Sequence, residues 1–316
     1  MKISVLIATR NRSSDLRTTL RQYQKQTFKN MEIVVVDNAS TDGTAEMIRA
    51  EFPGIVFLKL PDNIVHLALN LGIELSSGDI IWRSDDDSYP ETDDTFERVA
   101  EIFQKFPHIA IIGGEIINVA KGEKAFAHWH PLTGKNVEMP EDGFPSHSFM
   151  GCGAAIRREV FKSIGGFWDA FFYEELDFTA RAVLKGFTAK YFPTIRSLHF
   201  PSVSARPTDD RWVYSSTHYL RYQWRYFPFW TAFGRTMIYW FHQLFIGILR
   251  RVKPSSFFEA AFGMIAISFA TFRNERNVAP PGMIERLTLG ESFIGGIGRS
   301  FKETGARFLK RVFKRK

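Results

Sequence analysis

Cysteine is almost absent from this sequence. Only Cys152 occurs among 316 residues, so an internal disulfide is excluded, which fits a reducing compartment. Long apolar runs are also missing: the best candidates for a spanning segment, Thr236–Leu249 and Ala260–Phe272, have 14 and 13 uncharged residues. Because a membrane-spanning helix needs about 20, these stretches are predicted to be buried or interfacial helices. The apolar run Ile3–Ala8 is too short for a signal-peptide core and is expected to be a strand.

Net charge is nearly absent outside the last sixteen residues. The chain has a formal net charge of +7, and residues 301–316 carry +6 of it. Because residues 1–300 are nearly neutral, we expect no nucleic-acid partner. A helical tail would place basic residues on one face and four apolar residues on the other: Phe308, Leu309, Val312 and Phe313. This pattern predicts binding to an anionic membrane surface. The alternative is a solvated tail after helices that pack on the rest of the protein or on a partner.

The glycine-rich loops that commonly hold phosphates are missing as well. The turn after the first predicted strand reads ATRNRSS, residues 8–14, and contains no glycine. A dinucleotide-binding loop is therefore excluded there, and no G-x-x-x-x-G-K-[ST] loop occurs in the chain. Recognition of a nucleotide without these glycines favours a metal ion that is held by carboxylates and binds the diphosphate.

The first part of the chain alternates strand and helix patterns. Runs rich in Val and Ile predict strands at 2–8, 31–37, 55–60, 79–84 and 109–114. Helical patterns lie between and after them, at 13–26, 44–52, 65–76 and 91–106. This order predicts an α/β fold with a mainly parallel sheet covered by helices on both faces. In such sheets, ligands bind beyond the carboxyl ends of the strands.

A change of composition near Pro207 predicts a domain boundary. Before it, residues 151–206 contain a strand–helix unit, a second helix at 174–185 and short strands. From Arg211 onward strand patterns disappear and aromatic residues crowd in. We therefore expect a first domain at 1–206 and a helical, aromatic-rich region at 207–316.

Carboxylates gather where two predicted strands end. Asp85, Asp86 and Asp87 follow the strand at 79–84, and Asp37 ends the strand at 31–37. Adjacent carboxylates repel one another unless a cation offsets them, and Mg²⁺ or Mn²⁺ takes such oxygen ligands. A metal ion here would hold phosphate oxygens and stabilise a phosphate leaving group. The alternatives are a solvated acidic turn at 85–87 and an Asx-turn at Asp37.

Two further features supply candidate groups. Glu174, Glu175 and Asp177 open a predicted helix, where the helix dipole favours acids but where a carboxylate facing a cleft also suits a general base. Both interpretations stay open on these residues alone. His199 follows later in TIRSLHFPS. A lone histidine is more often structural, but a neutral imidazole could complete a metal site with the aspartates.

In this order, the features resemble glycosyltransferase family 2, the inverting enzymes of the Rossmann-like GT-A fold, including their rhamnosyltransferase-like members. The segment 4–48 is similar to the family's opening, and SDDDSYP at 84–90 resembles its D-x-D-x-x-P motif. The segments 151–167 and 174–187 resemble its acceptor-side region with the E-D-x-D helix. The resemblance covers about residues 2–200.

The resemblance implies a role for each candidate residue. Nucleoside recognition would fall to Thr9, Arg10, Arg12 and Asp37, with Asp37 contacting the base. Asp85, Asp87 and His199 would surround Mg²⁺ or Mn²⁺ on the diphosphate, with Asp86 also in the donor site. The catalytic base would be Glu175, which stands where the family usually has Asp. Val65 stands where the family often has Gly.

The resemblance also implies the overall function. Residues 1–206 would be a GT-A catalytic domain, with the nucleotide-sugar half at about 1–114 and the acceptor half at about 115–206. It would transfer a sugar from a nucleoside-diphosphate sugar to a hydroxyl of a glycan or lipid-linked acceptor, in surface polysaccharide assembly. The absence of Q-x-x-R-W favours a non-processive enzyme. We expect a cytoplasmic protein that is peripheral on the inner face of the cell membrane. The alternatives are a sugar-phosphate nucleotidyltransferase and a catalytically silent membrane adaptor.

Overall fold

The computed structural model describes residues 1–124, 138–168, 172–201, 208–250 and 252–288. The predicted amphipathic tail at 301–316 lies outside these residues. The chain divides into two compact units. One comprises Met1–Asp169 with Glu174–Ala205, and the other comprises Ala170–Tyr173 with Arg206–Lys316.

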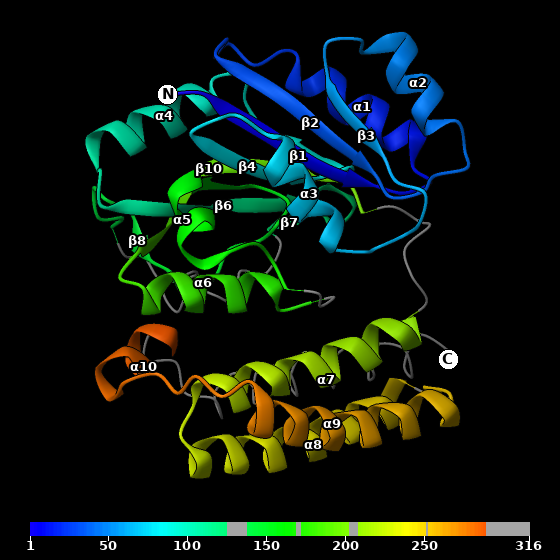
Figure 1. Ribbon diagram of the computed structural model, residues 1–316, viewed down its shortest axis with the longest axis vertical. Helices are drawn as coiled ribbons and strands as arrows, with labels where there is room; N and C mark the ends of the chain where they lie inside the picture. Colours follow the sequence, from blue (N-terminus) through cyan, green and yellow to red (C-terminus); the bar gives the residue numbers. More distant parts are fainter. Residues whose placement is uncertain (125–137, 169–171, 202–207, 251, 289–316) are drawn as a thin grey trace. The chain divides into compact units, whose positions relative to one another are not determined.

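The first unit is built around one mixed sheet (Figure 1). Its described strands are β1 (Ile3–Thr9), β2 (Met31–Asp37), β3 (Val56–Lys59), β4 (Ile80–Asp85), β5 (Ser88–Pro90), β6 (Ile109–Asn118), β7 (Glu123–Lys124), β8 (Phe144–Pro145), β9 (Ala154–Arg157) and β10 (Thr188–His199). The strand order is β3-β2-β1-β4-β9-β6-β10-β5, with β7 on β6 and β8 on β10. Parallel pairing joins β3, β2, β1 and β4, and also β6 and β10, whereas β9 runs antiparallel to both of its neighbours.

Helices cover both faces of this sheet, as the sequence predicts. One face carries α1 (Ser13–Tyr23), α2 (Thr44–Glu51) and α4 (Thr95–Lys105), and the other carries α3 (Leu67–Leu75), α5 (Arg158–Ile164) and α6 (Glu174–Leu184). Successive side chains of a strand point to opposite faces. Accordingly Val5 of β1 packs in the same core as Leu16 of α1, whereas Leu6 packs with Leu69 of α3. The predicted α/β class is confirmed.

The parallel register gathers the acidic strand ends at one edge of the sheet. Thr9 at the end of β1 pairs with Asp37 at the end of β2, and Ala8 pairs with Asp85 at the end of β4. Beyond Asp85 the chain turns back into β5, which pairs antiparallel with β10 and sets Ser88 opposite His199. The helix predicted from residue 91 begins only at Thr95, because residues 91–94 form a turn between β5 and this helix.

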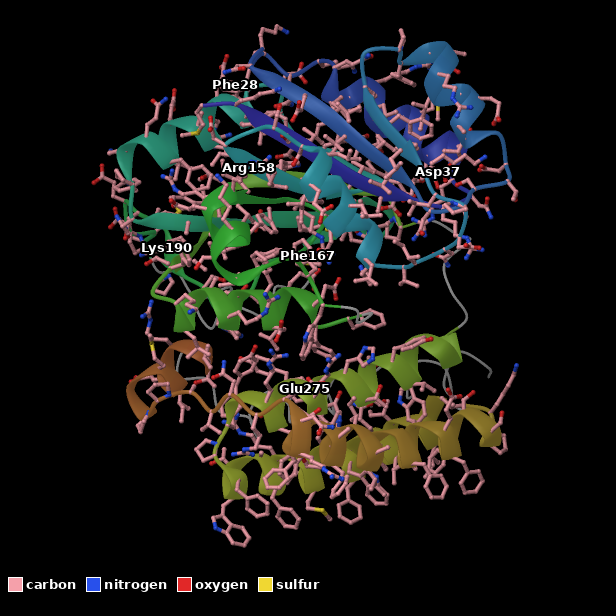
Figure 2. All side chains as sticks on the ribbon, viewed as in Figure 1. Phe28, Asp37, Arg158, Phe167, Lys190 and Glu275 are labelled. Carbon is pink, nitrogen blue, oxygen red and sulfur yellow. The ribbon has the colours of Figure 1, made fainter. Side chains whose placement is uncertain are left out.

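The described part of the second unit is helical. It consists of α7 (Thr208–Tyr226), α8 (Phe229–Arg250), α9 (Pro254–Asn274) and α10 (Pro281–Thr288). Trp212 of α7 stacks on Phe257 of α9, and Arg221 of α7 donates from Nε to Glu275 Oε2 at 2.8 Å just after α9. The labelled Glu275 can be followed in Figure 2. Among the described residues, only α9 has the length and the apolar composition of a helix that could cross a membrane.

Candidate active site

Three candidate metal ligands converge at the acidic edge of the sheet. Asp85 comes from the end of β4, Asp87 from the turn before β5 and His199 from the end of β10. One potential ligand atom from each lies within 4.8 Å of the others. His199 Nε2 lies 3.2 Å from Asp87 Oδ1. The two carboxylates are oxygen ligands that suit Mg²⁺ or Mn²⁺, and the imidazole adds a nitrogen ligand that suits a transition metal such as Mn²⁺. These residues therefore fit a divalent metal ion of the kind that the sequence suggests.

The electrostatics of this edge also fit a cation. Burial raises the pKa of Asp85, the charge of Asp87 raises it further, and Arg83 and His199 only partly offset this. Burial likewise raises the pKa of Asp86 to about 6. For His199, burial lowers the pKa, but the hydrogen bond and charge of Asp87 outweigh it, so the pKa lies above its usual value. A divalent cation between these groups would favour the ionised carboxylates.

Arg12 and Thr9 hold the neighbouring carboxylates from the turn after β1. Arg12 Nη1 donates to Asp86 Oδ1 at 2.8 Å and to Asp87 Oδ2 at 3.1 Å, while Thr9 Oγ1 donates to Asp86 Oδ2 at 2.7 Å. Burial lowers the pKa of Arg12, but the charges of Asp86, Asp87 and Asp85 outweigh this and raise it. Asp86 therefore anchors the turn that carries Arg12. Arg10 is exposed in the same turn.

Asp37 presents one buried oxygen without a partner. Its side chain is fully buried at the end of β2, on the edge that Figure 2 shows with the Asp37 label. Oδ1 accepts a hydrogen bond from the backbone N–H of Ser40 at 2.9 Å, whereas Oδ2 has no hydrogen-bond partner among the described residues. A buried acceptor without a donor is costly. A donor N–H on a bound ligand, such as that of a nucleobase, would satisfy it.

The candidate base lies at the start of α6, where Arg83 of β4 holds two glutamates. Arg83 Nη2 donates to Glu174 Oε1 at 2.9 Å, and its Nη1 lies 3.0 Å from Glu175 Oε1. The Glu175 side chain is 19% exposed, whereas that of Glu174 is only 4% exposed. Burial, together with the charge of Glu174, raises the pKa of Glu175 to about 7 against the opposing effect of Arg83. A carboxylate with this pKa suits proton removal near neutral pH.

Strand β4 links the candidate base to the candidate metal site. Arg83 and Asp85 are two residues apart on it, so their side chains leave the same face of the sheet. Arg83 also holds Glu175, so the candidate base is tied to the strand that ends in Asp85. The structure therefore brings together Asp85, Asp87, His199 and Glu175 from segments that are far apart in sequence.

Sequence reasoning missed Arg83. Its signal was present, because an arginine inside the apolar strand DIIWRS must be buried, and buried charges need partners. Asp177, the third acid of the helix, is fully buried, and Arg181 Nε donates to its Oδ2 at 2.7 Å. Arg181 also donates to the carbonyls of Ile164 and Gly166, so this ion pair fastens α6 to the end of α5.

A mixed sheet of this order, with carboxylates and a histidine at the carboxyl ends of its strands, defines a GT-A fold with a transferase-type site. Comparison of the sequence with protein families gives the particular family. The family model named "Glycosyl transferase family 2" matches residues 4–165, and the chain belongs to this family.

Known relatives agree with this membership. The chain is 27% identical over 210 residues to the "Probable glycosyltransferase YdaM" of Bacillus subtilis, covering 61% of this chain and 49% of the relative. It is 28% identical over 187 residues to the "Succinoglycan biosynthesis protein ExoA" of Rhizobium meliloti, covering 54% of each. The chain thus spans about half the length of the curated relatives that it matches.

Solved structures show the same fold. The mannosyltransferase PcManGT of Pyrobaculum calidifontis, solved with GDP-Man and Mn²⁺, superposes with a TM-score of 0.54 at 16% identity over 99% of this chain and 86% of that one. Residues 1–349 of S. aureus TarS, solved with UDP-GlcNAc, give a TM-score of 0.56 at 16% identity over 86% of this chain and 90% of that one. At this identity the likeness concerns the fold alone.

Proposed function

We propose that this chain is an inverting, metal-assisted glycosyltransferase. It transfers a sugar from a nucleoside-diphosphate sugar to a hydroxyl of a glycan or lipid-linked acceptor, and it does so non-processively. The observation that carries the proposal is the edge formed by Asp85, Asp87 and His199, with Glu175 held by Arg83 of the strand that ends in Asp85. The two solved neighbours named above were crystallised with nucleotide sugars, one of them with Mn²⁺, which supports the donor class and the cofactor.

The donor would bind across the ends of β1, β2 and β4. Asp37 would accept a hydrogen bond from the base through its unpartnered Oδ2. The turn with Thr9, Arg10 and Arg12 would hold the nucleoside, and Asp86 would keep this turn in place. Asp85, Asp87 and His199 would hold Mg²⁺ or Mn²⁺, which, when bound, neutralises charge on the diphosphate leaving group.

Glu175 is proposed as the general base. An acceptor hydroxyl has a pKa far above 7 and needs a base as it attacks. Glu175 would take the hydroxyl proton while the acceptor oxygen bonds to the anomeric carbon from the side opposite the nucleotide. The bond from that carbon to the diphosphate oxygen breaks in the same step, so the nucleoside diphosphate leaves with the bonding electrons. One displacement of this kind inverts the anomeric centre and needs no covalent enzyme intermediate.

We also propose an acceptor class and a cellular location. The relative from Rhizobium meliloti is named for succinoglycan biosynthesis, which supports a role in surface polysaccharide assembly. We take residues 1–206 as the catalytic domain and 207–316 as a membrane-associating region whose basic tail at 301–316 faces anionic lipid. The protein would then work in the cytoplasm, peripherally on the inner face of the cell membrane.

The deciding experiment supplies a panel of nucleoside-diphosphate sugars with Mn²⁺ or Mg²⁺ and measures thermal stabilisation, followed by hydrolysis of the donors that bind. Metal-dependent stabilisation by a nucleotide sugar and slow metal-dependent release of nucleoside diphosphate are expected. Formation of a sugar nucleotide from a nucleoside triphosphate and a sugar phosphate would instead identify a nucleotidyltransferase. Binding without any turnover, with every acceptor class tested, would point to a silent adaptor.

A further inference from the structure

Helices α8 and α9 leave an unusual number of large apolar side chains exposed. On α8, six of them recur every three or four residues, at Trp230, Phe233, Met237, Phe241, Phe245 and Ile248, beside the exposed Phe229 and Ile238. On α9 they recur in the same way, at Phe258, Phe262, Ile265, Phe269 and Phe272. Trp230 is 79% exposed and Phe262 is 69% exposed. Such a spacing sets each series on one side of its helix.

The two series belong to one surface. Phe233 and Met237 of α8 line the same groove as Ile265 and Phe269 of α9, and the groove has a volume of about 560 Å³. Figure 2 shows rings that project from α8 and α9 on the side opposite α7. We call these eleven side chains and their groove the apolar face. Soluble proteins rarely expose a continuous apolar patch of this extent, so the apolar face is expected to meet a partner.

The charge around the apolar face favours lipid as that partner. Residues 229–274 contain one acid and five basic residues. Arg235 donates to Gln223 of α7, so the cations that the structure describes beside the apolar face are Lys253 and Arg273. Lys253 and Arg273 are exposed at the two ends of α9. A protein interface has a polar rim around its apolar core, whereas α8 and α9 expose apolar side chains along most of their length. Apolar rings bordered by cations suit hydrocarbon beneath anionic headgroups.

We propose that α8 and α9 lie flat in one leaflet of a membrane, with the apolar face in the hydrocarbon and the flanking basic residues at the headgroups. The groove would be filled by lipid chains. This inference rests on the proposed membrane association and gives it a defined surface, but it does not depend on the proposed chemistry.

The packing of α7 on the buried side of α9 argues against a spanning helix. Ala260, Met264 and Thr271 are buried, and α7 packs along α9 from Trp212 against Phe257 to Arg221 paired with Glu275. If α9 crossed the bilayer, α7 would be drawn in with its charged side chains, which is costly in hydrocarbon. A helix that lies in the plane of the leaflet keeps α7 on the aqueous side.

The first test measures binding of the full chain to vesicles of phosphatidylcholine mixed with phosphatidylglycerol. The double variant Phe262→Ser with Phe269→Ser removes two exposed side chains, so the fold should persist, as circular dichroism and thermal melting will check. Its partition coefficient should fall about 100-fold or more, since two large apolar side chains no longer enter the leaflet. The matched control, Leu75→Ser with Tyr214→Ser, changes two exposed side chains off the apolar face and should bind as the wild type does.

The second test measures depth. Single Phe258→Cys, Phe262→Cys and Phe269→Cys variants can carry a nitroxide, because the native Cys152 is buried. Equal depths along α9 are expected. In a spanning helix, 258 and 269 would lie about 16 Å apart along the bilayer normal, at 1.5 Å per residue, on opposite sides of the bilayer centre. Residue 262 would then be the deepest of the three, and such unequal depths would overturn the proposal.

Two other results would also overturn it. One is that the double variant binds vesicles as strongly as the wild-type protein does. The other is that the wild-type protein does not bind vesicles but forms a dimer, and that the double variant does not form this dimer. A second copy of the chain would then cover the apolar face. Donor hydrolysis in the same preparations should be unchanged by the double variant. If the wild-type protein bound vesicles but showed no donor turnover, the proposed function would be contradicted and the membrane-binding surface would not.

Discussion

The guanidinium of Arg83 lies 3.0 Å from the carboxylate of Glu175, and this ion pair joins β4 to the first turn of α6. Arg83 is fixed on its other sides as well: it pairs with Glu174 and lies over the ring of Phe167, with Cζ 4.8 Å from the centroid. A side chain held by so many contacts has one orientation. It therefore sets both the position of the candidate base and the ease with which that base takes a proton.

Replacement of Glu175 tests its role directly. Glu175→Gln keeps the size of the side chain but cannot accept a proton, so transfer should fall about 10²–10⁴-fold while donor affinity stays within a few fold. Single-turnover transfer and calorimetric donor binding measure the two effects. The assignment would be wrong if Glu175→Gln transferred sugar normally while Glu174→Gln or Asp177→Asn abolished transfer.

The pH profile tests the coupling of Glu175 to Arg83. The base must be ionised, so the transfer rate should fall as the pH drops through about 7, the pKa to which burial raises Glu175. Arg83 lowers this pKa, and Arg83→Met should therefore move the acidic limb to higher pH. The variant should also lose about 3–5 kcal/mol of unfolding free energy, because two carboxylates lose their buried partner. If the acidic limb of the pH–rate profile did not move in a folded Arg83→Met protein, a group other than Glu175 would control that limb.

Much of this site could be predicted because its residues end strands. Asp37 and Asp85 each follow an apolar run, and parallel pairing must bring such ends to one edge. The contact of His199 with Asp87 could not be derived in this way. It depends on β5, a strand of three residues that pairs with the end of β10, and such a short segment carries no periodic pattern of its own.

The metal site predicts a linked loss of metal and nucleotide binding. Asp87→Ala removes a carboxylate from the candidate ligand set, so a nucleoside diphosphate with Mn²⁺ should no longer raise the melting temperature. Asp62→Ala, a change of an exposed acid on another loop, serves as the control and should behave as the wild type does. Equal nucleotide affinity of the wild-type protein with and without a chelator would refute the metal-mediated mode.

In the fold too, strands with a clear sequence pattern could be predicted, whereas strands that depend on pairing with distant segments could not. The five strands predicted from Val and Ile runs are present as β1, β2, β3, β4 and β6. The strand–helix unit expected after residue 151 is present as β9 and α5. The antiparallel placement of β9 between β4 and β6 could not be predicted, because its sequence, AAIR, is short and has no alternation. The short strands expected before residue 206 include β10, which has twelve residues and a register shift beyond Phe192. Its length depends on pairing with β6, β5 and β8 rather than on its own residues.

Deletion of the tail should weaken membrane binding without affecting the chemistry. Removing residues 301–316 takes away six net positive charges. At about 1 kcal/mol per basic residue near anionic lipid, and less when screened by salt, the loss should be a few kcal/mol. Vesicle binding should become weaker and less dependent on salt, while transfer to a soluble acceptor should be nearly unchanged. If binding persisted and thermal stability collapsed instead, the tail would be packed structure.

Val65 offers a test of the loop beside the proposed nucleoside site. Its backbone has φ of 52°, a left-handed conformation that strains a β-branched residue. The surrounding bonds enforce it: Asn38 Nδ2 donates to the carbonyl of Val65 at 3.0 Å, and the N–H of Ile64 donates to Asn38 Oδ1 at 2.8 Å. Asn38 directly follows Asp37, so the strained loop is tied to the residue that is proposed to read the base.

Val65→Gly should therefore stabilise the protein. Relief of the left-handed strain is worth about 1–2 kcal/mol, and the extra freedom of glycine in the unfolded chain offsets about 0.4–1 kcal/mol of it. A net gain near 1 kcal/mol in unfolding free energy is expected from urea denaturation. Val119→Gly, at a valine in a 3₁₀ turn with ordinary φ, should instead lose stability. Donor affinity of Val65→Gly should stay within a few fold of wild type, because both bonds to Asn38 use only backbone atoms of the loop. A stability loss in Val65→Gly equal to that of Val119→Gly would mean that packing of the valine side chain outweighs the strain.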